Sequence, residues 1–224
     1  MPKNKTKPIS TAIEDYLKAI WLVAQDASAS TNDLALQLKI SAPSVSSMLG
    51  KLREQNFVHY EPYRGVRLTE KGEREALRLL RRHRLIETFL LEHLGYDWGE
   101  VHEEAEKLEH AVSDTFTERL DTFLGHPSHD PHGDPIPTLK GKLPVTPNTP
   151  FAELSIGETL KIARLMSQDK DVLTYLKSLA IEPSKELQLV KREPVGGLVH
   201  VEIDGAETVL SKELAMLIRG EVIV

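Results

Sequence analysis

The chain has 224 residues, of which 40% are hydrophobic and 28% charged, so it is long and apolar enough for one large domain or two to three small ones. It contains no cysteine, which excludes disulfides, thiolate metal sites and cysteine catalysis. The net charge of −6 is unevenly spread: residues 1–75 carry 11 Lys and Arg against 9 Asp and Glu, whereas residues 76–150 carry 8 against 13. No apolar run approaches the length that spans a bilayer, so we expect no membrane partner and a cytoplasmic location.

A helix-turn-helix is predicted near the start of the chain. Thr11 with Glu14 has the pattern of a capping box for a first helix. Ser30 and Asp33 open a second, short helix. Ser41 caps a third helix, and Pro43 lies in its first turn. The apolar residues of the second and third helices have the spacing of one inward face: Leu34, Ala35, Leu38, Val45, Met48, Leu49 and Leu52.

The next stretch, F-V-H-Y-E-P-Y-R-G-V-R-L-T, predicts two short strands around a turn at Pro62 to Gly65. Such a hairpin, directly after a recognition helix, forms a wing. We therefore expect a winged helix-turn-helix that binds double-stranded DNA.

Candidate DNA contacts lie on the third helix and the wing. Hydroxyl groups can bond phosphates or base edges, a proline ring can meet a thymine methyl, and basic side chains can hold the backbone. The candidates are Ser41, Pro43, Ser44, Ser46, Ser47, Lys51, Arg53, Arg64 and Arg67. Helix capping or simple solvation is at least as good an account of any single serine.

The most informative residues follow in the next two helices. Thr69 caps a long helix that ends at about Leu94, and Asp97 with Glu100 forms a capping box for the next one. In V-H-E-E-A-E-K-L-E-H, four possible metal ligands stand at offsets 0, 4, 7 and 8, along one side of a helix: His102, Glu106, Glu109 and His110. On the preceding helix, His83 and Glu87 repeat the i, i+4 step, so the two helices could close around one or two divalent ions.

The ligand chemistry narrows the choice of metal. Carboxylates and imidazoles without sulfur suit Mn²⁺ or Fe²⁺, although Zn²⁺ or Co²⁺ would bind the same ligands more tightly. An acidic middle beside a basic front suits metal-dependent DNA binding, because divalent cations neutralise carboxylates and reduce their repulsion from phosphate. The alternative is that the Glu-rich helices are simply solvated.

A further helix begins at Ser113 or Asp114 and runs through Leu124. Its apolar residues, together with some of the long helix, could form either a dimer interface or an ordinary core. They are Phe116, Leu120, Phe123 and Leu124 of this helix and Leu85, Phe89 and Leu90 of the long helix.

The character of the chain changes after residue 125. Seven of the 13 prolines fall in residues 125–150, which predicts a semi-rigid connector. His126, His129 and His132 lie in it, and we expect a loop there and not a site, because such a backbone does not hold a fixed coordination geometry. Beyond it, strand-like segments at 160–165, 186–190, 198–203 and 221–224, with a helix at 169–179, predict a small β-barrel of about 70 residues.

The order of these elements, with E-D-Y-L, R-H-R-L-I-E, V-H-E-E-A-E-K-L-E-H and G-D-P-I-P, resembles the diphtheria toxin repressor family of metal-dependent regulators, including its manganese transport regulator branch. The resemblance covers nearly the whole chain. It implies a mainly α fold with a small β domain. Residues 1–75 would form the winged helix, 76–145 a helical metal-binding and dimerisation domain, and 151–224 an SH3-like (FeoA-like) barrel.

The resemblance also implies two metal sites. The primary site falls on Asp15, Glu106, Glu109 and His110, and the second on His83, Glu87 and His102. Family members with the barrel donate a further ligand from it, and Asp169, with Gln168 or Asp171, matches that region.

The departures from the family pattern are informative. Asp15 and Glu106 stand where iron-sensing members have Met and Cys, which shifts the resemblance toward manganese. Lys18 stands where the short manganese-sensing members carry a Glu, and those members lack the barrel. The chain thus combines the long architecture with a manganese-like primary site.

The implied function is a repressor of metal-uptake genes that responds to Mn²⁺ (or Fe²⁺) and binds a palindromic operator as a homodimer. Metal would join Asp15 to the helical domain and fix the angle of the DNA-binding domain. A di-metal enzyme is one alternative, but the chain supplies no separate nucleophile or base motif. A metal-buffering or adaptor protein with a peptide-binding barrel is another. Turnover assays test the enzyme, and an absence of metal-dependent operator binding would favour the adaptor protein.

Overall fold

The computed structural model describes residues 9–24, 28–61 and 64–223, and the chain divides into two compact units. Unit 1 is Met1–Arg81 with Leu139–Gly141, and unit 2 is Arg82–Thr138 with Lys142–Val224. The long helix α4 (Glu70–Leu94) contributes residues to both units. None of the helices in the described ranges has the length and apolar character that crossing a membrane requires.

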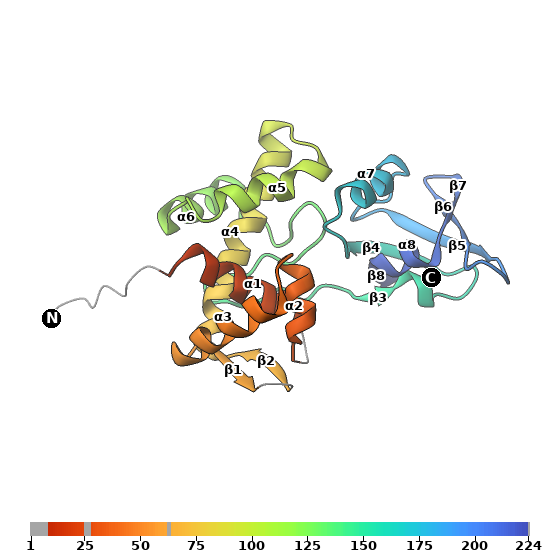
Figure 1. Ribbon diagram of the computed structural model, residues 1–224. Helices are drawn as coiled ribbons and strands as arrows, with labels where there is room; N and C mark the ends of the chain where they lie inside the picture. Colours follow the sequence, from red (N-terminus) through yellow and green to blue (C-terminus); the bar gives the residue numbers. More distant parts are fainter. Residues whose placement is uncertain (1–8, 25–27, 62–63, 224) are drawn as a thin grey trace. The chain divides into compact units, whose positions relative to one another are not determined.

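Unit 1 is a winged helix-turn-helix, which confirms the prediction (Figure 1). Its core is formed by apolar side chains that are completely buried, among them Leu17, Leu34 and Leu49, one from each of the first three helices. The elements are α1 (Thr11–Ala24), α2 (Thr31–Gln37), α3 (Ala42–Glu54), β1 (Val58–Glu61), β2 (Gly65–Leu68) and the first turns of α4.

Serine caps begin α2 and α3 where the sequence predicts. The Ser30 hydroxyl accepts a hydrogen bond from the Asp33 N–H at 3.1 Å, and the Ser41 hydroxyl accepts one from the Ser44 N–H at 3.4 Å. Each bond satisfies one of the N–H groups that have no partner in the first helical turn.

The predicted cap of α1 was wrong by one residue. The Ser10 carbonyl accepts the N–H groups of Ile13 and Glu14, so Thr11 is already inside the helix. Ser10 occupies the cap position because it directly precedes the first helical turn, and serine serves there as well as threonine.

The wing is a two-stranded antiparallel hairpin. Val58 pairs with Leu68 and Glu61 with Gly65, and Val66 forms an isolated bridge with Ala29. Pro62, which the sequence places in the turn, lies outside the described residues.

The helical part of unit 2 packs the later turns of α4 against α5 (Trp98–Leu108) and α6 (Asp114–Phe123). Its core includes Leu85 and Leu90 of α4, Val101 of α5 and Leu120 of α6. Gly95 ends α4 with a φ of 72°, a left-handed conformation that glycine adopts without strain.

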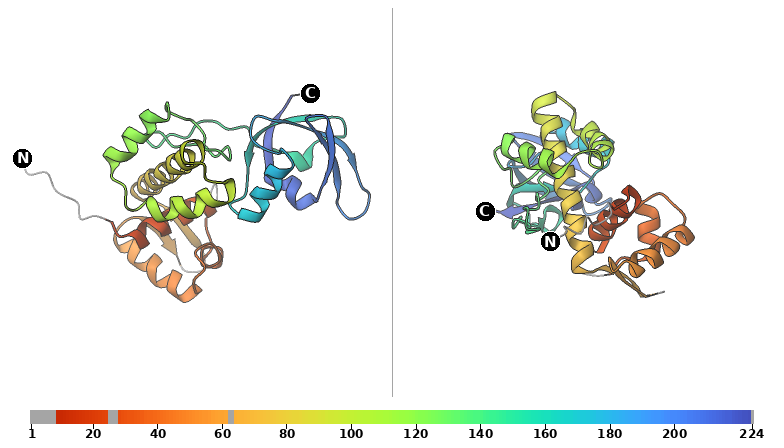
Figure 2. Two further views of the ribbon diagram at one scale, coloured as in Figure 1. Left: turned by 90° about the horizontal axis from the view of Figure 1, so that it is seen from above. Right: turned by 90° about the vertical axis from the view of Figure 1, so that its left-hand side faces the viewer.

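The C-terminal domain, residues 149–223, is built on a six-stranded antiparallel sheet with the order β3-β8-β4-β5-β6-β7, which curls around its core (Figure 2). Its strands are β3 (Thr149–Pro150), β4 (Thr159–Leu165), β5 (Glu186–Arg192), β6 (Val199–Ile203), β7 (Ala206–Leu210) and β8 (Ile218–Val222). Helix α7 (Lys170–Ser178) fulfils the predicted helix. The short helix η1 (Phe151–Glu153), α8 (Lys212–Leu217), β3 and β7 were not predicted.

Thr69 joins the wing to α4. Its hydroxyl accepts the Gly72 N–H at 3.1 Å and donates to the Asn56 carbonyl at 2.8 Å. We expect Thr69→Ala to lower the free energy of unfolding by about 1 to 2 kcal/mol, because the cap is lost. Urea denaturation followed by circular dichroism measures this. Thr69→Ser keeps the hydroxyl and should stay close to wild type, and equal losses in both variants would contradict the capping role.

Candidate metal centre

Helix α4 carries a run of polar side chains that are buried in the interior of unit 2. Arg82, His83, Arg84 and Glu87 are all buried, and Arg84 is only 1% exposed. Buried charges and imidazoles need partners, because leaving them unpaired costs several kcal/mol. The partners of these four residues define the site.

The first group of possible ligands is His83, His102 and Glu106, whose ligand atoms all lie within 4.8 Å of one another. The Nε2 of His83 lies 3.0 Å from the Nδ1 of His102, and the Nε2 of His102 lies 3.7 Å from a carboxylate oxygen of Glu106. The i, i+4 spacing on α5 therefore places His102 and Glu106 side by side, opposite His83 of α4.

The second group is Glu87, Asp130 and His132, all of them buried, and their ligand atoms also lie within 4.8 Å of one another. Asp130 and His132 come from the proline-rich connector. The Asp130 carboxylate accepts the backbone N–H groups of His132 at 2.9 Å and of Asp134 at 2.8 Å, so this loop is held in place. The expectation that the connector cannot hold a fixed geometry was therefore wrong at His132.

Sequence reasoning missed Asp130 altogether and set His132 aside. The signal available in the sequence was the D-P-H step, in which a carboxylate and an imidazole stand two residues apart. Its partner Glu87 lies more than 40 positions earlier, and no local pattern joins the two.

The charges in the second group are set by burial and by neighbours. Burial raises the pKa of Glu87, but the charge of His83 and hydrogen bonds from His102 and His83 outweigh it and hold this pKa well below its ordinary value. Burial lowers the pKa of His132. Glu87 is thus ionised and His132 neutral near pH 7, which are the forms that bind a cation.

Asp130 differs from Glu87. Burial, then the negative charges of Asp134 and Glu87, raise the pKa of Asp130 well above its ordinary value, and Arg84 opposes this. A cation that binds in this group would therefore compete with a proton at Asp130.

His83 links the two groups to Glu109. Its Nδ1 lies 2.6 Å from a Glu109 carboxylate oxygen and its Nε2 lies 2.9 Å from Glu87. The Glu109 side chain is completely buried.

The sequence predicts one helix that carries all four ligands of V-H-E-E-A-E-K-L-E-H, but the observed helix is shorter. Helix α5 ends at Leu108, and the Ala111 N–H bonds back to the Leu108 carbonyl in a turn. Glu109 and His110 therefore lie just beyond the helix, with the His110 Nε2 3.4 Å from a Glu109 oxygen. His102 and Glu106 remain on α5.

Two other predicted ligands come from other elements, α1 and the residue before α7. Asp15 is on α1 in unit 1, near Lys18, which is buried. Asp169 is exposed and accepts the Val172 N–H at 3.0 Å as the cap of α7, and its neighbours Gln168 and Asp171 are also exposed. The capping role accounts for Asp169 without a metal.

The donor set fits a divalent cation of hard to borderline character, since it consists of carboxylates and imidazoles. His132 supports this, because its Nε2 is buried and has no hydrogen-bond partner among the described residues. A buried imidazole nitrogen without a partner is costly unless something binds it.

The candidate DNA contacts of unit 1 are all exposed: Ser41, Pro43, Ser44, Ser46, Ser47, Lys51, Arg53, Arg64 and Arg67. Ser41 and Ser44 bond to each other at 2.8 Å as part of the cap of α3. Arg64 pairs with Glu61 at 3.2 Å in the wing.

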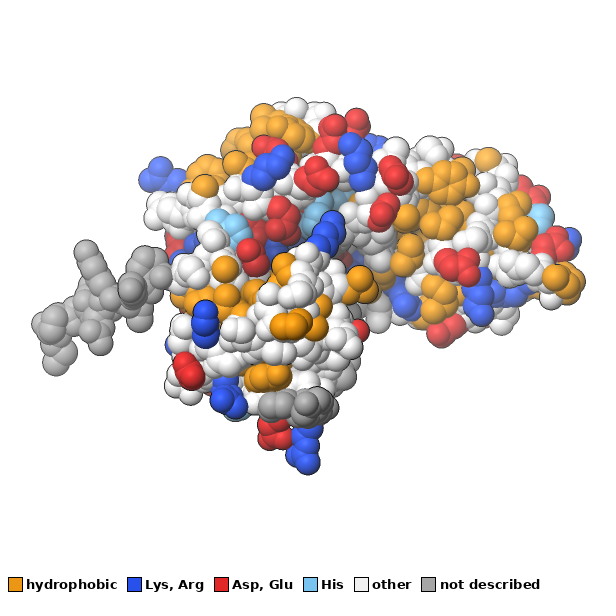
Figure 3. All heavy atoms as spheres, in the orientation of Figure 1, with side chains coloured by type: hydrophobic (Ala, Val, Ile, Leu, Met, Phe, Trp, Pro, Cys, Tyr) orange, Lys and Arg blue, Asp and Glu red, His pale blue; other side chains and the backbone are white. Residues whose placement is uncertain are grey.

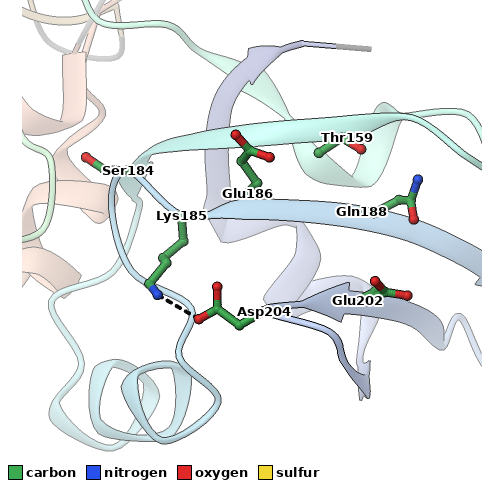
Figure 4. A pocket seen from close by; sticks show the side chains of 7 residues that line it. All are labelled: Thr159, Ser184, Lys185, Glu186, Gln188, Glu202 and Asp204. Carbon is green, nitrogen blue, oxygen red and sulfur yellow. Dashed lines mark hydrogen bonds and ion pairs between the residues drawn. The ribbon is translucent and has the colours of Figure 1, made fainter.

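A separate, open pocket of about 450 Å³ lies on the C-terminal domain (Figure 4). Lys185 and Asp204 form an ion pair of 2.6 Å at its edge. The pocket is lined by polar and acidic side chains from β4, β5, β6 and the adjoining turns, and none of them belongs to either ligand group.

Three protein families match this chain in order. Residues 8–66 match the N-terminal DNA-binding domain of iron-dependent repressors, residues 69–138 their metal-binding and dimerisation domain, and residues 149–222 the FeoA domain.

Individual relatives agree. The iron-dependent repressor IdeR of Mycobacterium tuberculosis is 31% identical over 223 residues, covering 93% of this chain and 96% of IdeR. The regulator MntR of Listeria innocua is 34% identical over 139 residues, covering 62% of this chain and 96% of MntR. The solved structure of a manganese-dependent transcriptional repressor in complex with manganese has a TM-score of 0.88 at 40% identity and covers 94% of this chain and all of that one.

A winged helix, a helical domain with clustered nitrogen and oxygen ligands and a FeoA domain together define a metal-dependent transcriptional repressor. The chain belongs to the iron-dependent repressor family, which includes IdeR and the diphtheria toxin repressor. The predicted resemblance, fold class and regulatory function are confirmed, and this family consists of DNA-binding repressors and not of enzymes.

The contacts of His83 lead to a prediction about acid stability. Because the folded pKa of Glu87 is lowered, its ionised form contributes stability that is present above its ordinary pKa and lost as the pH falls through its folded pKa. In His83→Ala, burial dominates and the pKa of Glu87 rises, so this contribution disappears. We expect the chelator-treated variant to lose about 3 to 5 kcal/mol near pH 7 and to show a flatter decline toward about pH 4.

Urea denaturation in EDTA at several pH values tests this. His200→Ala is a matched control, since His200 also lies between two carboxylates, Glu193 at 3.0 Å and Glu207 at 3.1 Å, but on the surface of the C-terminal domain. It should cause a far smaller change. An unchanged pH slope in His83→Ala would show that His83 does not hold the Glu87 charge.

Proposed function

We propose that this chain is a cytoplasmic, manganese-responsive repressor of metal-uptake genes, with Fe²⁺ as an alternative effector, and that it binds a palindromic operator as a homodimer. The observation that carries the proposal is the ligand chemistry: in the described residues, both ligand groups of unit 2 consist of carboxylates and imidazoles. Such donors suit Mn²⁺ and Fe²⁺ and contain no soft thiolate. Zn²⁺ would bind them as well, so selectivity rests on geometry and supply.

We assign three ligand sets. The primary site comprises Asp15, Glu106, Glu109 and His110, and the ligands of the second are His83, Glu87 and His102. The geometry of unit 2 supports a third set, Glu87, Asp130 and His132, which shares Glu87 with the second. Domain limits of 1–75, 76–145 and 151–224 remain our proposal for the chain.

The regulatory role of Asp15 follows from its position on α1, the first helix of the winged helix. A bound cation would supply a cross-link between this carboxylate and the ligands that follow α5. Asp15 would then restrain α1, and the two α3 helices of a dimer would keep the spacing of an operator with two half-sites. Without that restraint, the spacing would vary and affinity would fall.

A dimer interface is supported by the apolar surface of unit 2. Leu94, Phe116 and Phe123 are large hydrophobic residues with 46% to 63% of their surface exposed. Figure 3 shows hydrophobic side chains along the upper edge of this unit, over the end of α4 and over α6. The Phe123 ring packs against the His93 ring in a tilted arrangement, with a centroid distance of 4.8 Å. We propose that these side chains are covered by a second copy, since exposed apolar patches commonly mark interfaces.

The test is operator binding by fluorescence anisotropy. Metal-free protein is mixed with labelled promoter fragments of metal-transporter genes, and Mn²⁺, Fe²⁺ (without oxygen) and Zn²⁺ are titrated separately. We expect Mn²⁺ to raise operator affinity by about 5- to 150-fold, the range of ordinary allosteric coupling. Metal binding without any change in DNA affinity would argue against a metal-responsive repressor.

Asp15→Asn tests the coupling in the same assay. The variant should fold normally and lose most of the increase in DNA affinity caused by Mn²⁺, because its amide binds cations more weakly than the carboxylate. Asp204→Asn, on the C-terminal domain, is the control and should respond like wild type. If Asp15→Asn still responded fully to Mn²⁺, the restraint on α1 would have to come from elsewhere.

The wing offers a second prediction. Arg67 is exposed on β2, and we expect it to contact phosphate. Arg67→Ala should weaken binding about equally for operator and unrelated DNA and reduce the slope of log affinity against log salt by about 0.9. Lys191→Ala, on β5, is the charge-matched control. A loss confined to the operator would instead indicate that Arg67 contacts a base.

A further inference from the structure

We propose that the FeoA domain positions the ligands of the buried group, Glu87, Asp130 and His132. Gly133, Asp134 and Arg164 are the positioning residues. The inference rests on the proposed function insofar as this group binds a cation, and it adds a role for the C-terminal domain.

The segment from Asp130 to Asp134 lies directly against strand β4 of the FeoA domain. The Leu165 N–H donates to the His132 carbonyl at 2.9 Å, so the backbone of a ligand residue is bonded to the strand. The pairing of β4 with β8 shifts register between Ile162 and Arg164, which places a bulge at Ala163.

Gly133 fits against this bulge. Its φ is 86°, and a Cβ atom built on it would lie 1.9 Å from the Ala163 carbonyl oxygen. Only glycine allows the connector to approach the strand so closely. Gly133, which lies between the ligand His132 and Asp134, is therefore in direct backbone contact with the FeoA domain.

A chain of ion pairs runs from the FeoA domain to the ligand Asp130. Arg164 of β4 pairs with Asp134. Asp134 also lies 3.4 Å from Arg84 of α4, and Arg84 lies 3.7 Å from Asp130. Arg84 further donates to the Pro135 carbonyl. Arg84 thus pairs with the carboxylates at both ends of the segment, Asp130 and Asp134. Arg164 pairs with Asp134 from the other side.

The other ligand of the segment meets the FeoA domain through an aromatic ring. The His132 ring lies 5.1 Å from the Trp98 ring in an edge-to-face arrangement. Trp98 is part of the hydrophobic core of the FeoA domain, although it begins α5. Lys177 of α7 lies over the same ring, 5.5 Å from its centre. His132 is therefore oriented by a side chain that the FeoA domain holds.

Two of the three ligands in the group, Asp130 and His132, thus contact residues that do not bind the cation themselves but hold the ligands in place. Such partners fix ligand orientation, and their loss typically lowers metal affinity about 10- to 100-fold. By reciprocity, a cation in the group should also hold the connector against β4 more firmly.

The experiment uses the full chain with Trp21→Phe as background, so that Trp98 is the remaining tryptophan. Co²⁺ alone is titrated in, because it binds nitrogen and oxygen ligands and quenches nearby indole fluorescence. The part of the quenching that His132→Ala abolishes reports occupancy of the buried group. His102 also lies on α5, one turn from Trp98, so the quenching that survives in His132→Ala is assigned to the group of His83, His102 and Glu106.

Gly133→Ala and Gly125→Ala form a matched pair. Both glycines have positive φ, 86° and 75°, but only Gly133 meets the FeoA domain, since a Cβ on Gly125 has open space around it. We expect Gly133→Ala to weaken Co²⁺ binding in the buried group by about 10- to 100-fold and Gly125→Ala to leave it unchanged. Equal affinities in the two variants would overturn the proposal.

Arg164 supplies a milder test if Gly133→Ala does not fold. Arg164→Gln should weaken Co²⁺ binding in the buried group, and Arg164→Lys should restore part of it because the charge returns. Thermal unfolding in EDTA shows whether the metal-free fold is intact. A loss of stability with unchanged Co²⁺ affinity in Arg164→Gln would reduce Arg164 to a structural role and overturn the proposal.

These measurements distinguish failure of the third ligand set from failure of the positioning role. If wild type and His132→Ala give the same Co²⁺ quenching, the buried group binds no cation and the third ligand set fails together with this inference. If they differ but the Gly133 and Arg164 variants bind Co²⁺ like wild type, the ligand set stands and only the positioning role fails.

Discussion

The burial of charged side chains along α4 is the constraint on which unit 2 depends. Arg82, His83, Arg84 and Glu87 occupy two turns of one helix and are hidden from water. A helix can satisfy its own backbone, but such side chains need partners of their own. Apart from the contact between His83 and Glu87, these partners come from elsewhere in the chain. The partners are an imidazole of α5, a carboxylate in the turn after α5, the Asp114 carboxylate of α6 and two carboxylates of the connector. The fold around α4 is therefore organised by charge as much as by apolar packing.

The same constraint explains why the connector is ordered. It has almost no regular secondary structure, and its prolines remove backbone donors. Asp130 compensates, because its carboxylate accepts two backbone N–H groups of its own loop and lies 3.7 Å from the Arg84 guanidinium. A loop built in this way is rigid for electrostatic reasons. It can carry ligands, and it can transmit the position of a neighbouring domain to them.

Local sequence signals predicted much of this structure. Ser30, Ser41 and Thr69 each stand directly before the first residue of the helix that they cap, and the wing follows from alternation around a turn. The caps depend on residues within about four positions of one another, and the wing depends on two strands joined by a short turn. The spacing of His102 and Glu106 is of the same kind, and it places both on one side of α5.

What the sequence could not predict depends on contacts between distant residues. Glu109 falls outside α5 because the helix ends at Leu108, although the ligand spacing continues the helical period. Asp130 and His132 join Glu87 only after the connector has folded back onto α4, and their proline-rich surroundings suggested a loop without a site. Strand β7 alternates weakly and is mostly exposed, so its pattern was no stronger than that of a turn. Each case needs information from across the fold, which a local period does not contain.

The two ligand groups of unit 2 are not independent, because His83 belongs to one and contacts the other. Its Nε2 lies 2.9 Å from Glu87, and the Nδ1 of His102 lies 3.2 Å from the same carboxylate oxygen. Both imidazoles therefore lie within hydrogen-bonding distance of the Glu87 carboxylate. If His83 and His102 turned their nitrogens toward a cation beside Glu106, Glu87 would lose their hydrogen bonds, and its buried carboxylate would be left without a positive partner.

The affinity of the group with Asp130 and His132 for its own cation would then rise, although repulsion between the two ions would oppose this. Linkage makes the effect reciprocal, so filling either group would change the affinity of the other. Glu87 and His83 thus couple the two ligand groups through contacts seen in this structure.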